Sequence, residues 1–375
     1  MKGYINHSIT NDIKIPVVYY HSVGPFIQNW TRSFLTLAEE AFREHLKYFH
    51  RNFTTITLKE LWLIRNGYIR PVKNPLVITF DDGYSDNYNR ALPLLKEYGI
   101  KATIFISPEF TDDRNIVRSE KDGTGFLSWK EMESMQESGL IDIQSHTLTH
   151  TKCFISDKIT GFHHPGGDIL YPTVNIFPER KTDHIGDPGF EKLLPYGFPL
   201  FEEASAVLAR KVTINPDFIS ECISRFKNYD FGNYSFKDAF SLIKPLYKSY
   251  QKEERLITLK ESDDEYLIRV RNEIYRSKEI IEGRLNKKVE FLCWPHGDNN
   301  EFLHSMALDA GYLMTTKGKA RGVKDSAITR IPERMGVDFS SWKKKQKTVF
   351  KLKAFSGKFP YDFLLNTFRI VKWQR

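Results

Sequence analysis

Short apolar segments alternate with amphipathic segments over the first 150 residues, and this alternation limits the possible folds more than any other feature of the chain. Strands are predicted at residues 15–20, 54–56, 76–80, 102–106 and 141–145. Helices are predicted between them, and Ser/Thr-x-x-Glu capping boxes begin at Thr36, Thr57, Ser128 and, further along, Ser262. Strands separated by helices are typical of parallel βα units, whose functional side chains lie at the carboxyl ends of the strands.

The alternation is interrupted after residue 150 and then resumes. Residues 151–201 have little periodicity and are rich in Gly, Pro, His and aromatic residues, which predicts a long loop able to cover a binding site. Two short helices are predicted next, at residues 216–229 and 236–250. The later segments are a helix from 262 to about 285, a strand at 289–294, a helix at 300–310 and closing strands at 312–316 and 328–331. We therefore divide the chain into a main domain, 1–340, that contains an insertion, 151–261, and a tail, 341–375.

Two adjacent carboxylates follow the strand predicted at residues 76–80. They are Asp81 and Asp82, and Gly83 comes directly after them. Consecutive side chains of an extended segment point to opposite sides, so the two carboxylates are expected to have different roles. One can bind a metal while the other faces a substrate or a water. The alternative is an ordinary Asp-Gly turn at the end of a strand.

The strand predicted at residues 141–145 leads into His146 and His150. A spacing of four would place both imidazoles on one face of a helical turn, within reach of one ion. Two histidines and one carboxylate leave a coordination position open, which is the arrangement of a catalytic metal site.

Composition sets the compartment expected for the chain. With 375 residues, 41% of them hydrophobic, it can bury a barrel-sized core. Cys153, Cys222 and Cys293 have no paired spacing, which argues against a disulfide framework or a thiolate zinc site and favours a reducing compartment. Residues 1–14 are polar and no apolar run approaches about 18 residues, so neither a cleavable signal nor a membrane span is expected. The prediction is a cytoplasmic protein.

The formal charge of +8 is concentrated in the tail. Residues 341–375 hold ten Lys/Arg and one acid, Asp362, whereas the rest of the chain holds 45 basic and 46 acidic residues. Trp342, Phe350 and other bulky residues are interleaved with these cations, a composition that suits an anionic membrane surface. We expect peripheral attachment to the inner face of the membrane; a solvated terminal helix is the alternative. Nucleic acid is not expected as a partner, because the rest of the chain is neutral and lacks a recognition motif.

The motifs resemble those of a known family. Residues 79–83, followed by His146 and His150, resemble the first two motifs of the polysaccharide deacetylases with NodB homology, carbohydrate esterase family 4. Residues 16–23 and 294–297 are similar to the branch that deacetylates poly-N-acetylglucosamine. The resemblance covers residues 15–150 and 262–335. It implies an α/β fold, a distorted (β/α) barrel with a long insertion after the second motif.

The resemblance also implies roles for particular residues. Asp82, His146 and His150 would hold a divalent metal, with zinc the first expectation and nickel, cobalt or manganese as alternatives. Asp81 would be the general base. The turn that begins at Trp294 would contact the substrate and supply a backbone N–H for the oxyanion. The residues expected to bind substrate there are Trp294, Pro295 and Gly297.

Two departures from the family pattern affect the catalytic set. Cys293 stands where an arginine commonly orients the base, and Arg330 is the candidate to replace that arginine. The late histidine motif is not recognisable, so His296 and His21 are the candidates for the general acid.

The predicted function is removal of an N-acetyl group from an amino sugar. Expected substrates are an N-acetylated glycan, an oligosaccharide or a lipid-linked sugar. The alternatives are an O-deacetylase of the same fold and a catalytically degenerate glycan-binding module.

Overall fold

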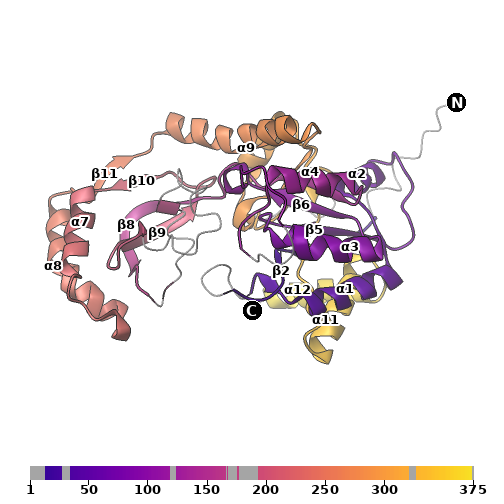
Figure 1. Cartoon of the computed structure of the whole chain (residues 1–375), viewed down its shortest axis with the longest axis horizontal. Helices are drawn as coiled ribbons and strands as arrows, with labels where there is room; N and C mark the ends of the chain where they lie inside the picture. The colour runs from indigo at the N-terminus through magenta and orange to yellow at the C-terminus, as the bar shows by residue number, and fades with distance from the viewer. Residues whose placement is uncertain are drawn as a thin grey trace.

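A computed structural model of the chain describes residues 13–27, 34–118, 124–165, 167, 175–176, 193–320 and 327–373. Its main body is a parallel sheet with helices packed around it (Figure 1). The strand order is β14-β13-β12-β7-β6-β5-β1-β15, and β4 pairs with β5. These strands are β1 (Val17–Tyr20), β4 (Thr54–Thr55), β5 (Pro75–Phe80), β6 (Ala102–Ile106), β7 (Ile141–Ser145), β12 (Phe291–Leu292), β13 (Met314–Thr316), β14 (Arg330–Ile331) and β15 (Arg334–Met335).

The two ends of this sheet lie close together. β14 and β15 are the terminal strands of the order, yet only residues 332–333 separate them in the chain. Three virtual Cα bonds span at most about 11 Å, so the sheet must curl until its ends nearly meet. No ladder joins β14 to β15 within the described residues. This geometry confirms the predicted α/β fold with a distorted, incompletely closed barrel.

Alternate residues of the strands pack on opposite sides of the sheet. On β5, Ile78 and Phe80 belong to the cluster that also contains helix residues such as Phe42 and Met132. Val77 instead packs in the barrel interior, in a cluster with residues of other strands and of one helix. The helices of this body are α1 (Glu39–Asn52), α2 (Leu58–Arg65), α3 (Leu92–Tyr98), α4 (Trp129–Glu137), α9 (Asp263–Leu285) and α10 (Glu301–Asp309).

Three of the four predicted capping boxes are confirmed. Thr57, Ser128 and Ser262 each accept from the N3 amide, and the N3 glutamate bonds back to the cap. The box predicted at Thr36 is wrong, because Thr36 lies in β3 (Thr36–Leu37), which pairs with β2 (Ser22–Val23). Helix α1 begins after Ala38, which has no side-chain cap bond.

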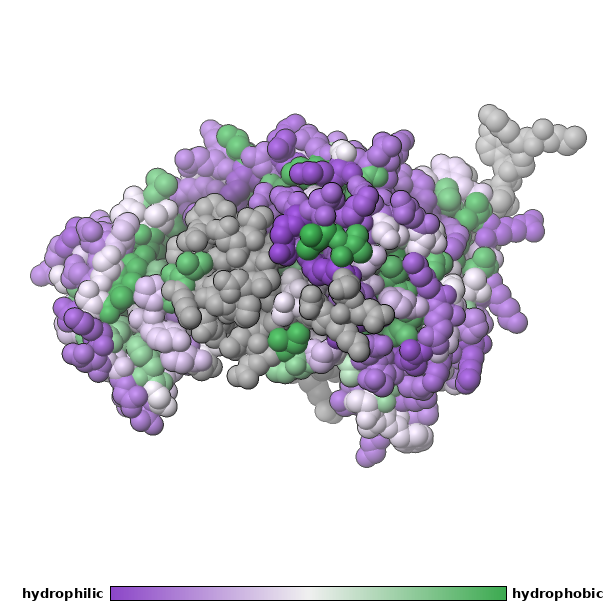
Figure 2. Space-filling view, viewed as in Figure 1, coloured by the Kyte–Doolittle hydropathy of each residue, from purple (hydrophilic) through white to green (hydrophobic). Residues whose placement is uncertain are grey.

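The insertion, at the left of Figure 1, has a hydrophobic core of its own. The helices predicted there are confirmed as α7 (Pro216–Arg225) and α8 (Phe236–Lys252). They pack against two antiparallel pairs, which are β8 (Lys152–Phe162) with β9 (Pro199–Ser205) and β10 (Val212–Ile214) with β11 (Ile257–Lys260). Hydrophobic residues gather within this lobe, whereas the face over the barrel helices is mostly hydrophilic (Figure 2).

The loop predicted over residues 151–201 is wrong at residues 152–162 and 199–201, which form strands. Residues 152–162 form a long strand, and its register with β9 shifts between Phe154 and Ile159. This irregularity breaks the two-residue alternation by which a strand is predicted. Parts of this range lie outside the described residues.

The tail forms two helices, α11 (Trp342–Phe355) and α12 (Tyr361–Trp373). Leu352 is fully buried in the main core, and the hydroxyl of Thr348 donates to the carbonyl of Asp338. Part of the tail is therefore packed on the barrel. Within the described residues, no helix has both the length and the apolar character needed to cross a bilayer.

Candidate metal centre and catalytic site

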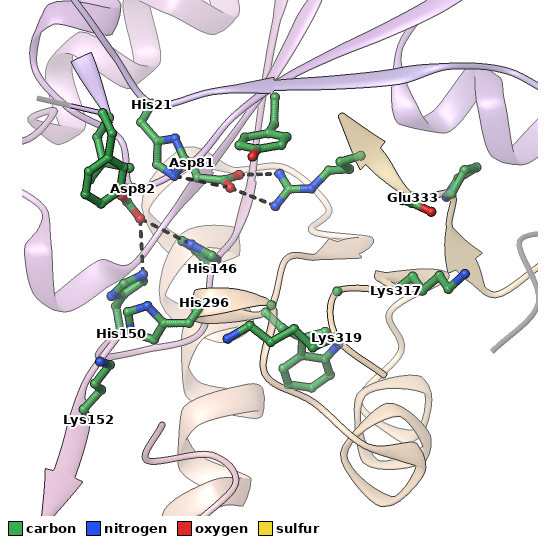
Figure 3. A pocket seen from close by; sticks show the side chains of 18 of the residues that line it. His21, Asp81, Asp82, His146, His150, Lys152, His296, Lys317, Lys319 and Glu333 are labelled. Atoms are coloured by element: carbon green, nitrogen blue, oxygen red, sulfur yellow. Dashed lines mark hydrogen bonds and ion pairs between the residues drawn. The ribbon is translucent and has the colours of Figure 1, made fainter. Parts of the chain in front are cut away.

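A cavity of about 380 Å³ lies at the carboxyl ends of the barrel strands (Figure 3). Segments that follow β1, β5, β7, β12 and β13 contribute to its wall. The predicted site residues among its lining are His21, Asp81, Asp82, His146, His150, Trp294, His296 and Gly297. The structure thus brings together residues up to 276 positions apart in the chain, because parallel strands end at one edge.

Asp81 and Asp82 both face this cavity, for different backbone reasons. Asp81 continues the inward alternation of Val77 and Thr79 along β5. Asp82 has a φ of 71°, so the extended alternation stops at this residue. A Cβ at Gly83 would lie 2.7 Å from Ile106 Cγ2, and the φ of 68° also favours glycine. The prediction that neighbouring carboxylates point to opposite sides is therefore wrong at this turn.

Asp82, His146 and His150 converge on one point. The Nε2 atoms of both histidines lie 3.3 Å from Asp82 Oδ1, which has no well-aligned hydrogen bond among the described residues. Nδ1 of His146 lies 2.8 Å from the carbonyl oxygen of Cys293. A carbonyl only accepts, so Nδ1 carries a proton and Nε2 is the ring nitrogen left to bind a cation beside Asp82. These donors fit a divalent cation between them.

Helix α9 holds the loop that carries the two histidines. The Glu273 carboxylate accepts from the amides of Leu148 (3.1 Å) and Thr149 (2.9 Å) and from the Thr149 hydroxyl. The segment is not the helical turn predicted from the spacing, since His150 has a φ of 51°. The two imidazoles meet because the loop folds back on itself and Glu273 fixes it.

Arg334 orients Asp81. Its two terminal nitrogens donate to Asp81 Oδ1 at 2.6 Å and to Oδ2 at 2.8 Å, a bidentate pair. Burial opposes ionisation of Asp81, but the charge and hydrogen bonds of Arg334 outweigh it and hold the pKa of this carboxyl below its usual value. Asp81 is therefore an ionised, positioned carboxylate.

The expectation that Arg330 orients the base is wrong. Arg330 is buried, and its guanidinium donates to Asn299 Oδ1 (2.9 Å) and Glu301 Oε1 (2.8 Å). The reason is strand order: Arg330 begins β14, beside β13, whereas Arg334 begins β15, beside β1 and two strands from β5. Only the second arginine can reach Asp81.

A second group of potential ligands consists of Asp81, His146 and Cys293. Arg334 occupies both oxygens of Asp81, and its Nη2 lies 3.1 Å from Cys293 Sγ. A cation at that point would face this buried guanidinium. Electrostatics therefore favour the set that contains Asp82.

His21 and His296 both line the cavity on opposite flanks of the ligand set. His21 follows β1, and its Nε2 lies 3.9 Å from Asp81 Oδ2. The ring centroid of His296 lies 4.7 Å from that of His150. Burial, together with the nearby His150 and Lys152, lowers the pKa of His296 to about 3.

The turn predicted to contact substrate lies in the cavity wall as Pro295–Gly297, a single 3-10 turn. Trp294 is fully buried in the main core, so its ring offers little free face for stacking on a sugar. Pro295 has no amide hydrogen, and the Gly297 amide donates to Trp294 O at 3.0 Å. Among the described residues, the His296 N–H of this turn has no acceptor and could serve an oxyanion.

Several residues that line or support the cavity were not predicted from the sequence. They are Arg334, Glu273 behind the histidine loop, and the rim residues Lys152, Lys317, Lys319 and Glu333. A signal for Arg334 exists, because this arginine follows a predicted closing strand by three residues. Choosing it over Arg330 needs the strand order.

Comparison with known proteins agrees with this geometry. Residues 69–168 match the family model for polysaccharide deacetylase. A putative polysaccharide deacetylase of Bacillus subtilis, YxkH, is 35% identical over 138 residues, which is 36% of this chain and 43% of that protein. Less than half of that relative's length is therefore matched. A poly-beta-1,6-N-acetyl-D-glucosamine N-deacetylase of Staphylococcus aureus is 28% identical over 235 residues, covering 56% of this chain and 77% of the relative.

Two solved structures have the same fold. A de-N-acetylase from Aggregatibacter actinomycetemcomitans superposes with a TM-score of 0.55 at 18% identity, over 89% of this chain and 99% of the other. The BpsB deacetylase domain from Bordetella bronchiseptica superposes with a TM-score of 0.50 at 17% identity, over 86% of this chain and 96% of the other. The resemblance to the polysaccharide deacetylases is confirmed.

Proposed function

We propose that this chain, whose barrel carries a polysaccharide deacetylase domain, is a metal-dependent hydrolase that removes N-acetyl groups from an amino-sugar glycan. The observation that supports this most directly is one cavity with two carboxylate sites. Asp82 Oδ1 lies near Nε2 of both His146 and His150 and has no well-aligned hydrogen bond among the described residues. The Arg334 guanidinium keeps Asp81 ionised. A metal site beside a separate base suits hydrolysis of an amide.

The metal would be a divalent cation held by Asp82, His146 and His150. Two imidazoles and one carboxylate suit zinc, and they also accept nickel, cobalt or manganese. When bound, such an ion polarises a carbonyl group and lowers the pKa of water.

The chain's own residues would supply the remaining steps. Asp81 would take a proton from the attacking water, since Arg334 keeps it ionised and oriented. The His296 N–H would donate to the oxygen that becomes negative. His21, 3.9 Å from Asp81, is the first candidate to protonate the leaving amine. The His296 imidazole is the weaker candidate, because its pKa is lowered to about 3 and it holds little ionised form near neutral pH.

Poly-N-acetylglucosamine is the first substrate class to test. The Staphylococcus aureus relative is named for that polymer, and 77% of its length is matched. A lipid-linked sugar as the substrate stays a prediction. So does a cytoplasmic location.

The decisive experiment measures free amine and acetate released from β-1,6-linked N-acetylglucosamine oligomers. We expect both products to appear in equal amounts and a chelator to abolish them. Asp81→Asn should lower the rate by about 10²-fold or more while bound metal stays stoichiometric. Asp82→Asn should lose the metal itself.

Other outcomes would favour the alternatives. Acetate release without new amine, from an O-acetylated glycan, would identify an O-deacetylase. Binding of the oligomer with no product, and no change on Asp81→Asn, would identify a glycan-binding module. Chelator-insensitive release of both products would refute the metal-dependent mechanism.

A further inference from the structure

One side of α12 and of the turn before it is apolar and exposed to solvent. We call the set Phe359, Pro360, Phe363, Leu364 and Phe368 the α12 stripe. Phe359 is 82% exposed, Phe363 62% and Phe368 66%. Leu364 and Phe368 are four apart and therefore share one side of the helix, and Phe363 is exposed next to Leu364 in the chain.

Other side chains of α12 attach the helix to the rest of the molecule. Arg369 donates to both carboxylate oxygens of Glu333, at 3.0 and 2.9 Å. The ring of Tyr361 packs edge-on against Phe350 of α11. These contacts fix the orientation of the helix, so the exposure of the α12 stripe is a defined feature of the fold. Exposed aromatic side chains gathered in this way mark interaction surfaces.

Exposed cations are close to this stripe in the chain. Lys358 directly precedes it, and the first turns of α11 expose four further lysines and an aromatic side chain. These are Lys343, Lys344, Lys345, Lys347 and Trp342, the last 74% exposed. Residues 341–375 carry ten basic residues and one acid. The partner of this surface should therefore be both anionic and able to accept phenyl rings.

We propose that α11 and α12 dock the protein on an anionic lipid bilayer. The α12 stripe would enter the interface between headgroups and acyl chains, and the lysines would contact lipid phosphates and carboxylates. A second copy of this chain fits less well, since two such tails would repel each other. This inference does not depend on the proposed deacetylase activity.

Helix α12 is attached to the wall of the cavity described above through Arg369, not through the stripe. Glu333, the partner of Arg369, contributes to the cavity wall and directly precedes Arg334. The Glu333 side chain therefore joins α12 to the wall of the cavity. A docked molecule would hold its cavity close to the bilayer surface, where a glycan that emerges from a membrane would pass.

The test is co-sedimentation of the full chain with lipid vesicles at low and high salt. One vesicle is pure phosphatidylcholine, and the other contains about 30% phosphatidylserine to give a surface potential like that of an anionic leaflet. We expect binding to the anionic vesicle only, weakened by salt. The double variant Phe363→Ser/Phe368→Ser should bind the anionic vesicle more weakly than the unmodified chain, by at least about tenfold.

The matched control is Phe302→Ser on α10, because Phe302 is 48% exposed and lies outside the tail. It should bind as the unmodified chain does. Both variants should unfold at the unmodified temperature, since their side chains are exposed. Absence of binding by the unmodified chain, equal binding to both vesicles, or unchanged binding of the double variant would overturn the proposal. A dimer that the double variant abolishes would overturn it too, by assigning the stripe to a second copy.

Discussion

At the scale of single residues, the site depends on one buried ion pair. Asp81 is 4% exposed, a position that by itself disfavours a charged carboxylate. Arg334 reverses this effect. The ring centroids of Tyr19 and Phe105 lie 5.3 and 5.8 Å from its Cζ atom. A buried pair of this kind contributes less to stability than to the charge state and direction of the carboxylate.

Arg334→Gln should lower kcat by about 10²-fold or more while metal content stays stoichiometric. Without the guanidinium, burial raises the pKa of Asp81, so activity should be lost at a higher pH as the solution is acidified. The pH profile of kcat measures this shift of the acid limb. Arg330→Gln is the control: it breaks contacts to Asn299 and Glu301 and should reduce stability without moving the acid limb.

The residues proposed as metal ligands and as the base could be predicted from the sequence, whereas the arginine that pairs with Asp81 could not. Asp82, His146 and His150 are recognisable because their spacing follows strands that the apolar pattern also predicts. Arg330 lies in the closing strand predicted at 328–331 and Arg334 follows it by three residues, and the two differ in which edge of the sheet they reach. Strand order is a tertiary property and has no local signal.

At the scale of elements, α9 connects the site to the barrel surface. Glu273 lies on this helix and holds the amides of Leu148 and Thr149, between the two histidine ligands. Glu273→Ala should weaken metal affinity by about 10–100-fold, as loss of a supporting contact does in other metal sites. Metal titration into chelator-treated protein measures the change. Glu279→Ala, on the same helix with a side chain 61% exposed, should leave the affinity unchanged.

Helix α1 carries a pH-sensitive contact in the core. His45 is fully buried, its Nδ1 lies 3.1 Å from the Tyr20 hydroxyl, and burial lowers its pKa to about 4. In the unfolded chain His45 binds a proton below about pH 6.5, whereas in the folded chain it binds one only below about pH 4. The free energy of unfolding therefore falls as the pH falls across this window. The expected loss is about 3 kcal/mol.

Urea unfolding of His45→Gln at several pH values tests this expectation. Glutamine can still bond the Tyr20 hydroxyl but does not titrate, so the stability loss between pH 7 and 4 should be smaller by about 3 kcal/mol. His50→Gln, on the exposed side of α1, should follow the unmodified chain. Equal slopes for the chain and for His45→Gln would contradict the assignment.

At the scale of the whole molecule, the chain has a barrel, an inserted lobe with a separate core and a helical hairpin at its end. The apolar periodicity predicted the parallel βα units and the two helices of the lobe, since those segments have regular patterns, and the family resemblance implied the barrel. It did not predict β8 and β9, whose register shifts remove the alternation. The composition of the tail predicted a basic segment but not how it packs on the barrel.

The tail is expected to stabilise the barrel as well as to face a membrane. Leu352 is fully buried in the main core, so Leu352→Ala should cost about 2–5 kcal/mol in the free energy of unfolding. Phe368→Ser, 66% exposed, should change it by less than about 0.5 kcal/mol. Chemical denaturation of both variants separates the two roles. An unchanged stability of Leu352→Ala would mean that α11 is a detachable appendage, whereas the expected loss means that deleting residues 341–375 would damage the barrel and could not test membrane docking.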